Sequence, residues 1–235
     1  MNDVKSYWSQ QTSSRHRFDN DEIYRKKAEE NLLLMSQEDR VSGCVDLGCG
    51  AGELLSYLSN NCVINVALDF SEAMLEKARN RLSDKNIQFV NEDALSYLKH
   101  SVDSVWIASG SINQLLDAKS QLEFLDLFVD TASVKSFYLF DCIDPSRYVL
   151  FAAGAINRYD LNRPPSWLRR IVGFGRGLVR AVFQPSWFDF APLGGYMGYG
   201  FAPGFWRREC ERRNLKVELV SSKFYEYRYH AIIRK

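Results

Sequence analysis

A glycine-rich loop flanked by aspartates has the residue types and spacing of a ligand-binding site. The glycines are Gly48, Gly50 and Gly52, and Asp46 stands two residues before the first of them. Glycine lets ligand atoms approach the backbone, whereas a carboxylate beside the loop disfavours an anionic ligand. The spacing also differs from the G-x-G-x-x-G pattern that binds a dinucleotide pyrophosphate. We therefore expect a ligand that carries an ammonium or sulfonium group.

Two further aspartates end the next two apolar runs. Asp69, nineteen residues past Gly50, is placed to accept hydrogen bonds from both hydroxyls of a ribose. Asp93 can accept a hydrogen bond from an exocyclic amine such as that of adenine. Structural roles remain open as well, because Gly48 and Gly52 would each permit a tight turn and Asp93 is suited to capping a helix.

The segments that must position these residues alternate between strand and helix. Strands are expected at 43–47, 63–68, 87–90, 104–108 and 136–142. Helices are expected at 21–37, 53–59, 71–82 and 119–130, and a short helix is expected to follow 91–93 and to end at about 99. A helix at 203–214, a strand at 216–220 and a final run at 224–233 follow. The alternation predicts a doubly wound α/β sheet with parallel strands, and the short last connection requires an antiparallel C-terminal strand pair.

A cap insertion after the fifth strand interrupts this alternation. Residues 143–202 contain five of the six prolines and many arginines and aromatic residues. We therefore expect one domain over 1–235, with an N-terminal arm and helix over 1–40 and the cap over 143–202.

Three segments of the chain resemble class I S-adenosylmethionine-dependent methyltransferases. They are VDLGCGAGELLSYL, ALDFSEAMLEKARNRL and FVNEDALSYL, and together with the closing strand pair they extend the resemblance over about 40–142 and 203–235. The resemblance implies a Rossmann-like, seven-stranded sheet and S-adenosyl-L-methionine as cofactor. The cofactor contacts that it implies are Asp46, Gly48, Gly50, Gly52, Asp69, Phe70, Met74, Asp93, Ala94 and Ser109. For Met74, packing in the core is an equal alternative.

Some subclasses of this family are disfavoured by the segment after the fourth strand. It reads Ser109-Gly110-Ser111, without the Asp/Asn-Pro-Pro-aromatic element of enzymes that methylate base amino groups in nucleic acids. It also lacks the Asp that binds magnesium in catechol-type enzymes, although Asp141 and Asp144 stand near the second position of that metal site. The five cysteines show no zinc-ligand spacing. We expect no metal and no DNA substrate.

Candidates for a catalytic base are few, because the chain has three histidines. His16 lies in the N-terminal arm and His230 in the last strand. Asp141, at the carboxyl end of the fifth strand, faces the edge where open α/β sheets bind ligands. For each histidine, an ordinary surface or packed position is the alternative.

Charge is distributed unevenly along the chain. Residues 1–142 contain 14 Lys+Arg and 22 Asp+Glu, a net −8, whereas residues 143–235 contain 16 and 7, a net +9. The pattern over 167–183 predicts an amphipathic helix with Arg169, Arg176 and Arg180 on its polar side. These charges would meet an anionic acceptor or an anionic membrane surface, or else attract the acidic half of the same chain.

The sequence thus predicts a methyltransferase that modifies a hydroxyl, less favourably an amine, of a small anionic acceptor that is sugar- or lipid-linked. RNA methylation and a catalytically silent cofactor-binding subunit are the alternatives. Neither a secretory signal nor a membrane-spanning run is evident, so we expect the protein in the cytoplasm.

Overall fold

A computed structural model describes residues 20–100, 104–112, 116–152 and 198–235, together with residues 167, 171, 175 and 190–192. Its strands are β1 (Cys44–Leu47), β2 (Ile64–Asp69), β3 (Gln88–Asn91), β4 (Val105–Ser109), β5 (Ser136–Ile143), β6 (Phe190–Pro192), β7 (Tyr199–Phe201), β8 (Lys216–Ser221) and β9 (Arg228–Arg234). Its helices are α2 (Asp21–Leu34), α3 (Gln37–Ser42), α4 (Leu55–Leu58), α5 (Glu72–Arg81), α6 (Ala94–Leu98), α8 (Ala118–Asp130), α9 (Pro145–Ala152) and α11 (Pro203–Glu211).

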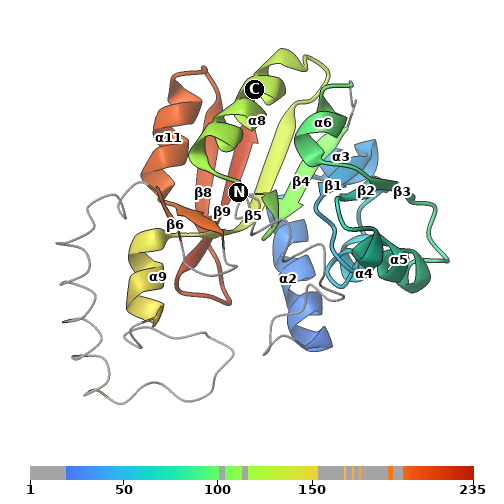
Figure 1. Cartoon of the computed structure of the whole chain (residues 1–235), viewed down its shortest axis with the longest axis horizontal. Coiled ribbons are helices and arrows are strands. Elements are labelled where there is room, and N and C mark those ends of the chain that lie inside the picture. The colour runs from blue at the N-terminus through green and yellow to red at the C-terminus, as the bar shows by residue number, and fades with distance from the viewer. Residues whose placement is uncertain are drawn as a thin grey trace.

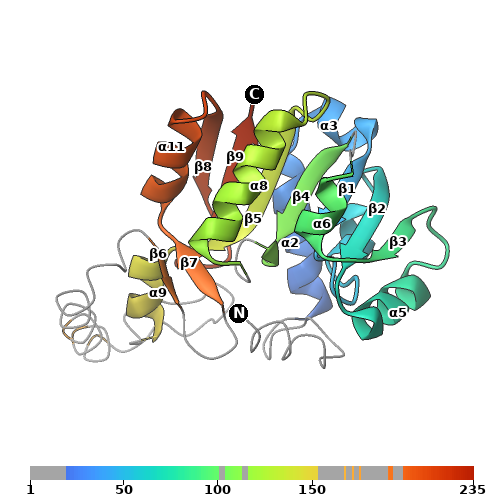
Figure 2. The same cartoon turned by 45° about the horizontal axis from the view of Figure 1, so that its top comes forward.

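Seven strands form one twisted sheet in the order β3-β2-β1-β4-β5-β9-β8 (Figures 1 and 2). The strands from β1 to β5 pair in parallel, and β9 pairs antiparallel with both β5 and β8. The strand order reverses between β1 and β4, and open α/β sheets bind ligands outside the carboxyl ends of the strands at such a point. The predicted doubly wound sheet and its antiparallel strand pair are confirmed.

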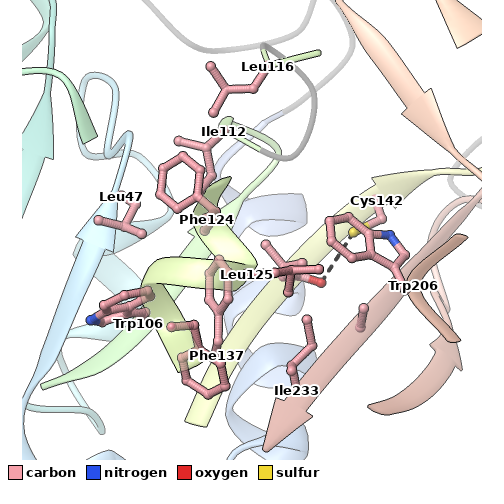
Figure 3. Packing of buried hydrophobic residues seen from close by; sticks show 14 of the residues in the cluster. Leu47, Trp106, Ile112, Leu116, Phe124, Leu125, Phe137, Cys142, Trp206 and Ile233 are labelled. Carbon is pink, nitrogen blue, oxygen red and sulfur yellow. Dashed lines mark hydrogen bonds between the residues drawn. The ribbon is translucent and has the colours of Figure 1, made fainter. Parts of the chain in front are cut away.

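Helices cover both faces of the sheet, because successive side chains of a strand point to opposite faces. Trp106 and Phe137 belong to a core beneath α6, α8 and α11, whereas the following residues, Ile107 and Tyr138, belong to a core beneath α2, α4 and α5 (Figure 2). In the first core, the ring of Trp106 meets that of Phe137 edge-on, with centroids 5.6 Å apart (Figure 3). These two cores fix the sheet against its helices.

Three predicted boundaries need correction. The helix expected over 21–37 ends at Leu34, because Met35 is extended, and Ser36 then caps α3 by accepting a hydrogen bond from the N–H of Asp39 (3.1 Å). The helix expected over 53–59 is the single turn α4. The final run, expected from 224, becomes a strand only at Arg228. In the third case, a turn precedes the strand, because the N–H of Arg228 donates to the carbonyl oxygen of Tyr225 (3.0 Å).

The insertion after β5 is described in part. It contributes α9 and the two-stranded antiparallel sheet of β6 and β7. Of the expected amphipathic helix over 167–183, the described residues Trp167, Ile171 and Gly175 are helical, and the first two are 68% and 60% exposed. Its three arginines lie outside the described residues, and the division of the chain into arm, core and cap stays a prediction. In the described part of the chain, no helix has the length and apolar character needed to cross a membrane.

Candidate functional site

The glycine loop follows β1 and is held against β2 by its backbone. The N–H groups of Gly48 and Cys49 both donate to the carbonyl oxygen of Leu68, at 2.8 and 2.9 Å. Gly48 has a φ of 83°, in the left-handed region that favours glycine. A Cβ on Gly48 would also lie 2.6 Å from the Cβ of Ser111, so a larger residue would not fit. Gly48 therefore makes a tight turn and packs closely against Ser111, and its contact with the cofactor stays a prediction.

Asp69 joins the glycine loop to the start of α5. Its Oδ2 accepts a hydrogen bond from the N–H of Gly50 and its Oδ1 accepts one from the N–H of Ser71, each at 2.9 Å. Burial raises the pKa of this carboxyl, and the two N–H donors partly offset that effect. Each carboxylate oxygen can accept a further hydrogen bond. Asp69 therefore supports the loop and retains the capacity to bind two ligand hydroxyls.

Asp46 is buried in β1, immediately before the loop, with 6% of its surface exposed. Burial, and then the negative charge of Asp69, raise its pKa from 3.8 to about 7. Among the residues that the structure describes, no Lys, Arg or His pairs with this carboxylate. An unpaired carboxylate in this setting would be stabilised by a positively charged ligand.

A pocket of about 490 Å³ opens beside the loop, outside the carboxyl ends of β1, β2 and β3. Its lining residues are Gly48, Leu68, Asp69, Phe70, Glu92, Asp93, Ala94, Leu95, Ser111, Ile112 and Leu116. The structure thus brings together Gly48, Asp69, Phe70, Asp93 and Ala94, which the sequence had placed at one site. Asp93 also caps α6, because its Oδ1 accepts a hydrogen bond from the N–H of Leu95 (3.1 Å).

Other predicted contacts lie near this pocket without lining it. Asp46, Gly50 and Gly52 belong to β1 and the loop behind it, and Ser109 ends β4. Met74 is 3% exposed within α5, which favours its packing alternative.

Six lining residues had not been predicted as contacts, namely Leu68, Glu92, Leu95, Ser111, Ile112 and Leu116. Ser111 and Ile112 follow the strand next to β1, at the carboxyl edge where ligands bind, and this position was the signal available for them. Glu92 and Leu95 flank the predicted Asp93 and Ala94.

Two of the three candidate bases lie in a buried charge cluster at the carboxyl end of β5. Asp141 Oδ2 lies 3.4 Å from the Nζ of Lys27 and 3.6 Å from an Nη of Arg228. Burial alone would raise the pKa of Asp141, but the charges of Lys27 and Arg228 outweigh it and hold the pKa at about 2. A carboxylate with so low a pKa is a weak proton acceptor, and this environment suits charge pairing better than catalysis.

His230 is 1% exposed in the same cluster. Its Nδ1 accepts a hydrogen bond from the N–H of Asp141 (3.3 Å), so Nδ1 carries no proton. Its Nε2 lies 3.5 Å from Oε1 of Glu30. The third candidate, His16, lies outside the described residues, and all three roles stay predictions.

No group of three or more His, Cys, Asp or Glu side chains that could hold a metal ion occurs in the described ranges. Asp141 and Asp144, which stand near the second position of the magnesium site of catechol-type enzymes, interact with other groups of the protein. Asp141 pairs with cations, and Oδ1 of Asp144 accepts hydrogen bonds from the N–H and hydroxyl of Ser146, at 3.0 and 2.6 Å. The expectation of a metal-free site stays a prediction.

The strand order, the glycine loop and the acids in β1, at the end of β2 and after β3 are those of the class I S-adenosylmethionine-dependent methyltransferase fold. Residues 44–129 match the model of a family described as a methyltransferase domain. The chain therefore contains a methyltransferase domain and has the fold of class I S-adenosylmethionine-dependent methyltransferases. No curated protein matches the sequence.

Solved structures with the same fold have diverged far in sequence. The N-methyltransferase NodS from Bradyrhizobium japonicum WM9 superposes with a TM-score of 0.59 at 12% identity, covering 99% of this chain and 98% of that one. The magnesium protoporphyrin IX methyltransferase ChlM from Synechocystis PCC 6803 has a TM-score of 0.53 at 14% identity, covering 90% and 83%. The small RNA methyltransferase HEN1 has a TM-score of 0.55 at 14% identity. The chain corresponds to only 27% of the length of HEN1, although the match covers 94% of this chain.

Proposed function

We propose that this methyltransferase modifies a hydroxyl group, less favourably an amine, of a small anionic acceptor that is linked to a sugar or a lipid. The observation that supports an anionic acceptor is the net +9 of residues 143–235, in contrast to the acidic cofactor half. The acids of the pocket are matched to the cofactor, so the cations are available for the acceptor.

The residues of the pocket suit S-adenosylmethionine, whose sulfonium group supplies an activated methyl group. We assign Asp46 to the positive charges of the methionyl end, since burial has left this carboxylate without a cation partner in the described structure. Asp69 has two oxygens that can each accept a ribose hydroxyl. Phe70, Asp93 and Ala94 also line the pocket and are assigned to the adenine, with Asp93 accepting a hydrogen bond from its amine.

Methyl transfer is an in-line displacement, so the protein mainly has to orient the acceptor and exclude water. When a hydroxyl attacks, a lone pair of its oxygen would form the new bond to the methyl carbon, the carbon–sulfur bond would break with its electron pair left on sulfur, and the hydroxyl proton must leave. Asp141 and His230 are committed to each other and to buried charges, and we assign this proton to neither of them. His16 is the remaining candidate of the three.

An acceptor screen with cofactor labelled at the methyl group tests the proposal. Extracts fractionated into polar metabolites, glycans, lipids and RNA would each be incubated with the purified protein. We expect label in an alkali-stable, anionic small-molecule, glycan or lipid fraction. Label that appears only in RNA, and disappears after nuclease treatment, would replace the proposal with RNA methylation, the activity named for the structurally similar HEN1.

The role of the basic cap, including its contact with an anionic membrane surface, requires a separate variant. Replacing Arg169, Arg176 and Arg180 with Gln should raise the KM for the acceptor or abolish sedimentation with anionic liposomes. Either effect should shrink as salt rises, because exposed charges are screened within about 8 Å at physiological ionic strength. The matched control replaces three cations of the N-terminal half, namely Arg25, Lys77 and Arg79. Equal effects of both triple variants would indicate non-specific attraction.

A further inference from the structure

Asp141 adopts a backbone conformation that is unusual for a residue with a side chain. Its φ is 58°, and the pairing of β5 with β9 shifts register between Leu139 and Cys142. A left-handed residue other than glycine costs free energy and persists only where its surroundings hold it. Here the N–H of Asp141 donates to Nδ1 of His230 (3.3 Å). The end of β5 is therefore kinked and held in place by β9.

The side chain of Asp141 joins three elements at one point. Lys27 comes from α2 and Arg228 from β9, and both cations approach the same carboxylate oxygen. The ring of Tyr225 also contacts both cations, with Lys27 Nζ at 4.6 Å and Arg228 Cζ at 4.7 Å from its centroid. The side chains of Lys27, Asp141 and Arg228 are 7%, 9% and 3% exposed, so solvent screens these charges poorly. Removing the carboxylate would take away the negative charge that both buried cations face.

The kinked end of β5 also contacts the wall of the cofactor pocket. The carbonyl oxygen of Phe140, the residue before Asp141, accepts a hydrogen bond from the N–H of Gly110 (3.0 Å). Gly110 precedes Ser111, which lines the pocket and whose hydroxyl donates to the carbonyl oxygen of Leu47. Ser111 in turn lies against Gly48. Two hydrogen bonds therefore connect the kinked end of β5 to the pocket wall and to β1.

We propose that Asp141 is a positioning residue for cofactor binding. By pairing with Lys27 and Arg228 at the kinked end of β5, it holds Gly110 and Ser111 against the glycine loop. This role rests on the proposed cofactor pocket and differs from the predicted role of Asp141 as a base, because Asp141 acts through the pocket wall and transfers no proton.

The variant Asp141→Asn isolates the charge. Asparagine tolerates the left-handed conformation and has nearly the same shape, so the kink itself remains accessible. Without cofactor, we expect the Gly110 amide of this variant to exchange with solvent deuterium about tenfold faster than in the wild type. The Kd for S-adenosylhomocysteine, measured by calorimetry, should rise about tenfold.

Glu209→Gln is the matched control for stability. Glu209 is also a buried carboxylate, 6% exposed, and contacts Arg212 and Arg213 at 2.8 and 3.1 Å, but it does not line the pocket. This variant should lower the Tm without changing the Gly110 exchange rate or the Kd. If Asp141→Asn lowered the Tm in the same way and left both other quantities at wild-type values, Asp141 would be structural only and the proposal would be overturned.

A second substitution tests the charge-pairing step itself. Adding Lys27→Met to Asp141→Asn removes one of the two cations that face residue 141, and we expect it to recover part of the lost affinity and of the Gly110 protection. If Asp141→Asn does not fold, Lys27→Met alone is the test. We then expect a threefold change in the Gly110 exchange rate and in the Kd for S-adenosylhomocysteine, and no change in either would overturn the proposal. Failure of the wild-type protein to bind the cofactor would instead refute the proposed pocket, and the Gly110 exchange rates would still test the positioning role.

Discussion

Asp46 and Asp141 are both buried carboxylates in strands of the same sheet, each 6% exposed, but their surroundings differ. Burial, together with the charge of Asp69, raises the pKa of Asp46 to about 7. At Asp141, the charges of Lys27 and Arg228 overcome burial and hold the pKa at about 2. Asp141 therefore pairs with cations of the protein, whereas Asp46 pairs with none among the described residues.

The two residues are equally buried, but the cations around Asp141 indicate a structural role, and their absence around Asp46 in the described part of the chain indicates a role in ligand binding. A buried charge requires a partner, and Asp141 has two in the same chain. Asp46 is next to the pocket proposed for a cofactor that carries positive charge. We therefore expect the bound cofactor to provide the cation that pairs with Asp46. Burial alone would not have distinguished the two residues.

The largest effect is expected at Asp69, an acid that lines the pocket. Asp69→Asn removes the charge that the ribose hydroxyls would meet and weakens the support of Gly50, so the affinity for S-adenosylhomocysteine should fall roughly ten- to a hundredfold. Calorimetry measures the change. Asp144→Asn, which alters a capping acid at α9, is the control and should bind normally. Unchanged affinity in Asp69→Asn would remove Asp69 from the site.

Asp46 should make cofactor binding depend on pH. Since its pKa is about 7 in the folded protein without cofactor, the carboxyl is mostly neutral below that pH and ionised above it. Affinity for a cationic ligand should therefore increase as the pH rises from about 6 to about 8. Asp46→Asn should bind more weakly at the higher pH and lose this dependence. A wild-type affinity that is flat over this range would contradict the contrast with Asp141.

The same substitution should affect stability in the opposite direction. A carboxyl whose pKa is raised on folding binds its proton more tightly in the folded state, so stability is lost as the pH rises from about 4 to about 7. Asp46→Asn removes this loss and should raise the Tm of the cofactor-free protein at pH values above 7. Thermal unfolding at two pH values checks the sign, and a lower Tm for the variant at high pH would show that Asp46 is already paired.

A smaller effect is expected at Ser111, which connects the two regions. Ser111→Ala removes the hydrogen bond to the carbonyl of Leu47 and should lower the free energy of unfolding by about 1 kcal/mol. The loosened wall should weaken cofactor binding by less than the loss seen with Asp69→Asn. Urea titration and calorimetry on the same samples separate the two changes.

No effect is expected from metal chelation. Asp141 and Asp144 have partners within the protein, and the segment after β4 provides Ser109 and Ser111 rather than a carboxylate. Methyl transfer should therefore proceed equally in EDTA and in magnesium. Loss of turnover with EDTA and its recovery with magnesium would mean that Asp141 leaves its cations to bind a metal.

Local patterns were sufficient to predict much of the fold and half of the pocket. The glycine loop and the acids after successive strands lie at one edge because parallel strands end there together, so Asp69 and Asp93 could be placed from the sequence. The start of α5 is also local, because the hydroxyl oxygen of Ser71 accepts a hydrogen bond from the N–H of Met74 (3.4 Å).

The charge cluster could not be predicted in the same way. Lys27, Asp141 and Arg228 are separated by more than eighty residues at each step, and no local pattern connects them. Their meeting depends on the position of β9 next to β5 and on the way α2 covers the sheet. Without those contacts, Asp141 looked like an accessible acid at the ligand-binding edge.

The interior position of β9 also affects how the chain can mature during synthesis. A ribosome completes α2 and β5 long before β9, yet β9 is the strand that lies between β5 and β8. Oε1 of Glu30 likewise accepts a hydrogen bond (2.8 Å) from the N–H of Lys223, which is 193 residues away. Until the last strands emerge, β5 is an open sheet edge of the kind that pairs with other chains, and Asp141 lacks one of its two cations. Nascent chains stalled before β9 should therefore depend on chaperones more than the completed protein does.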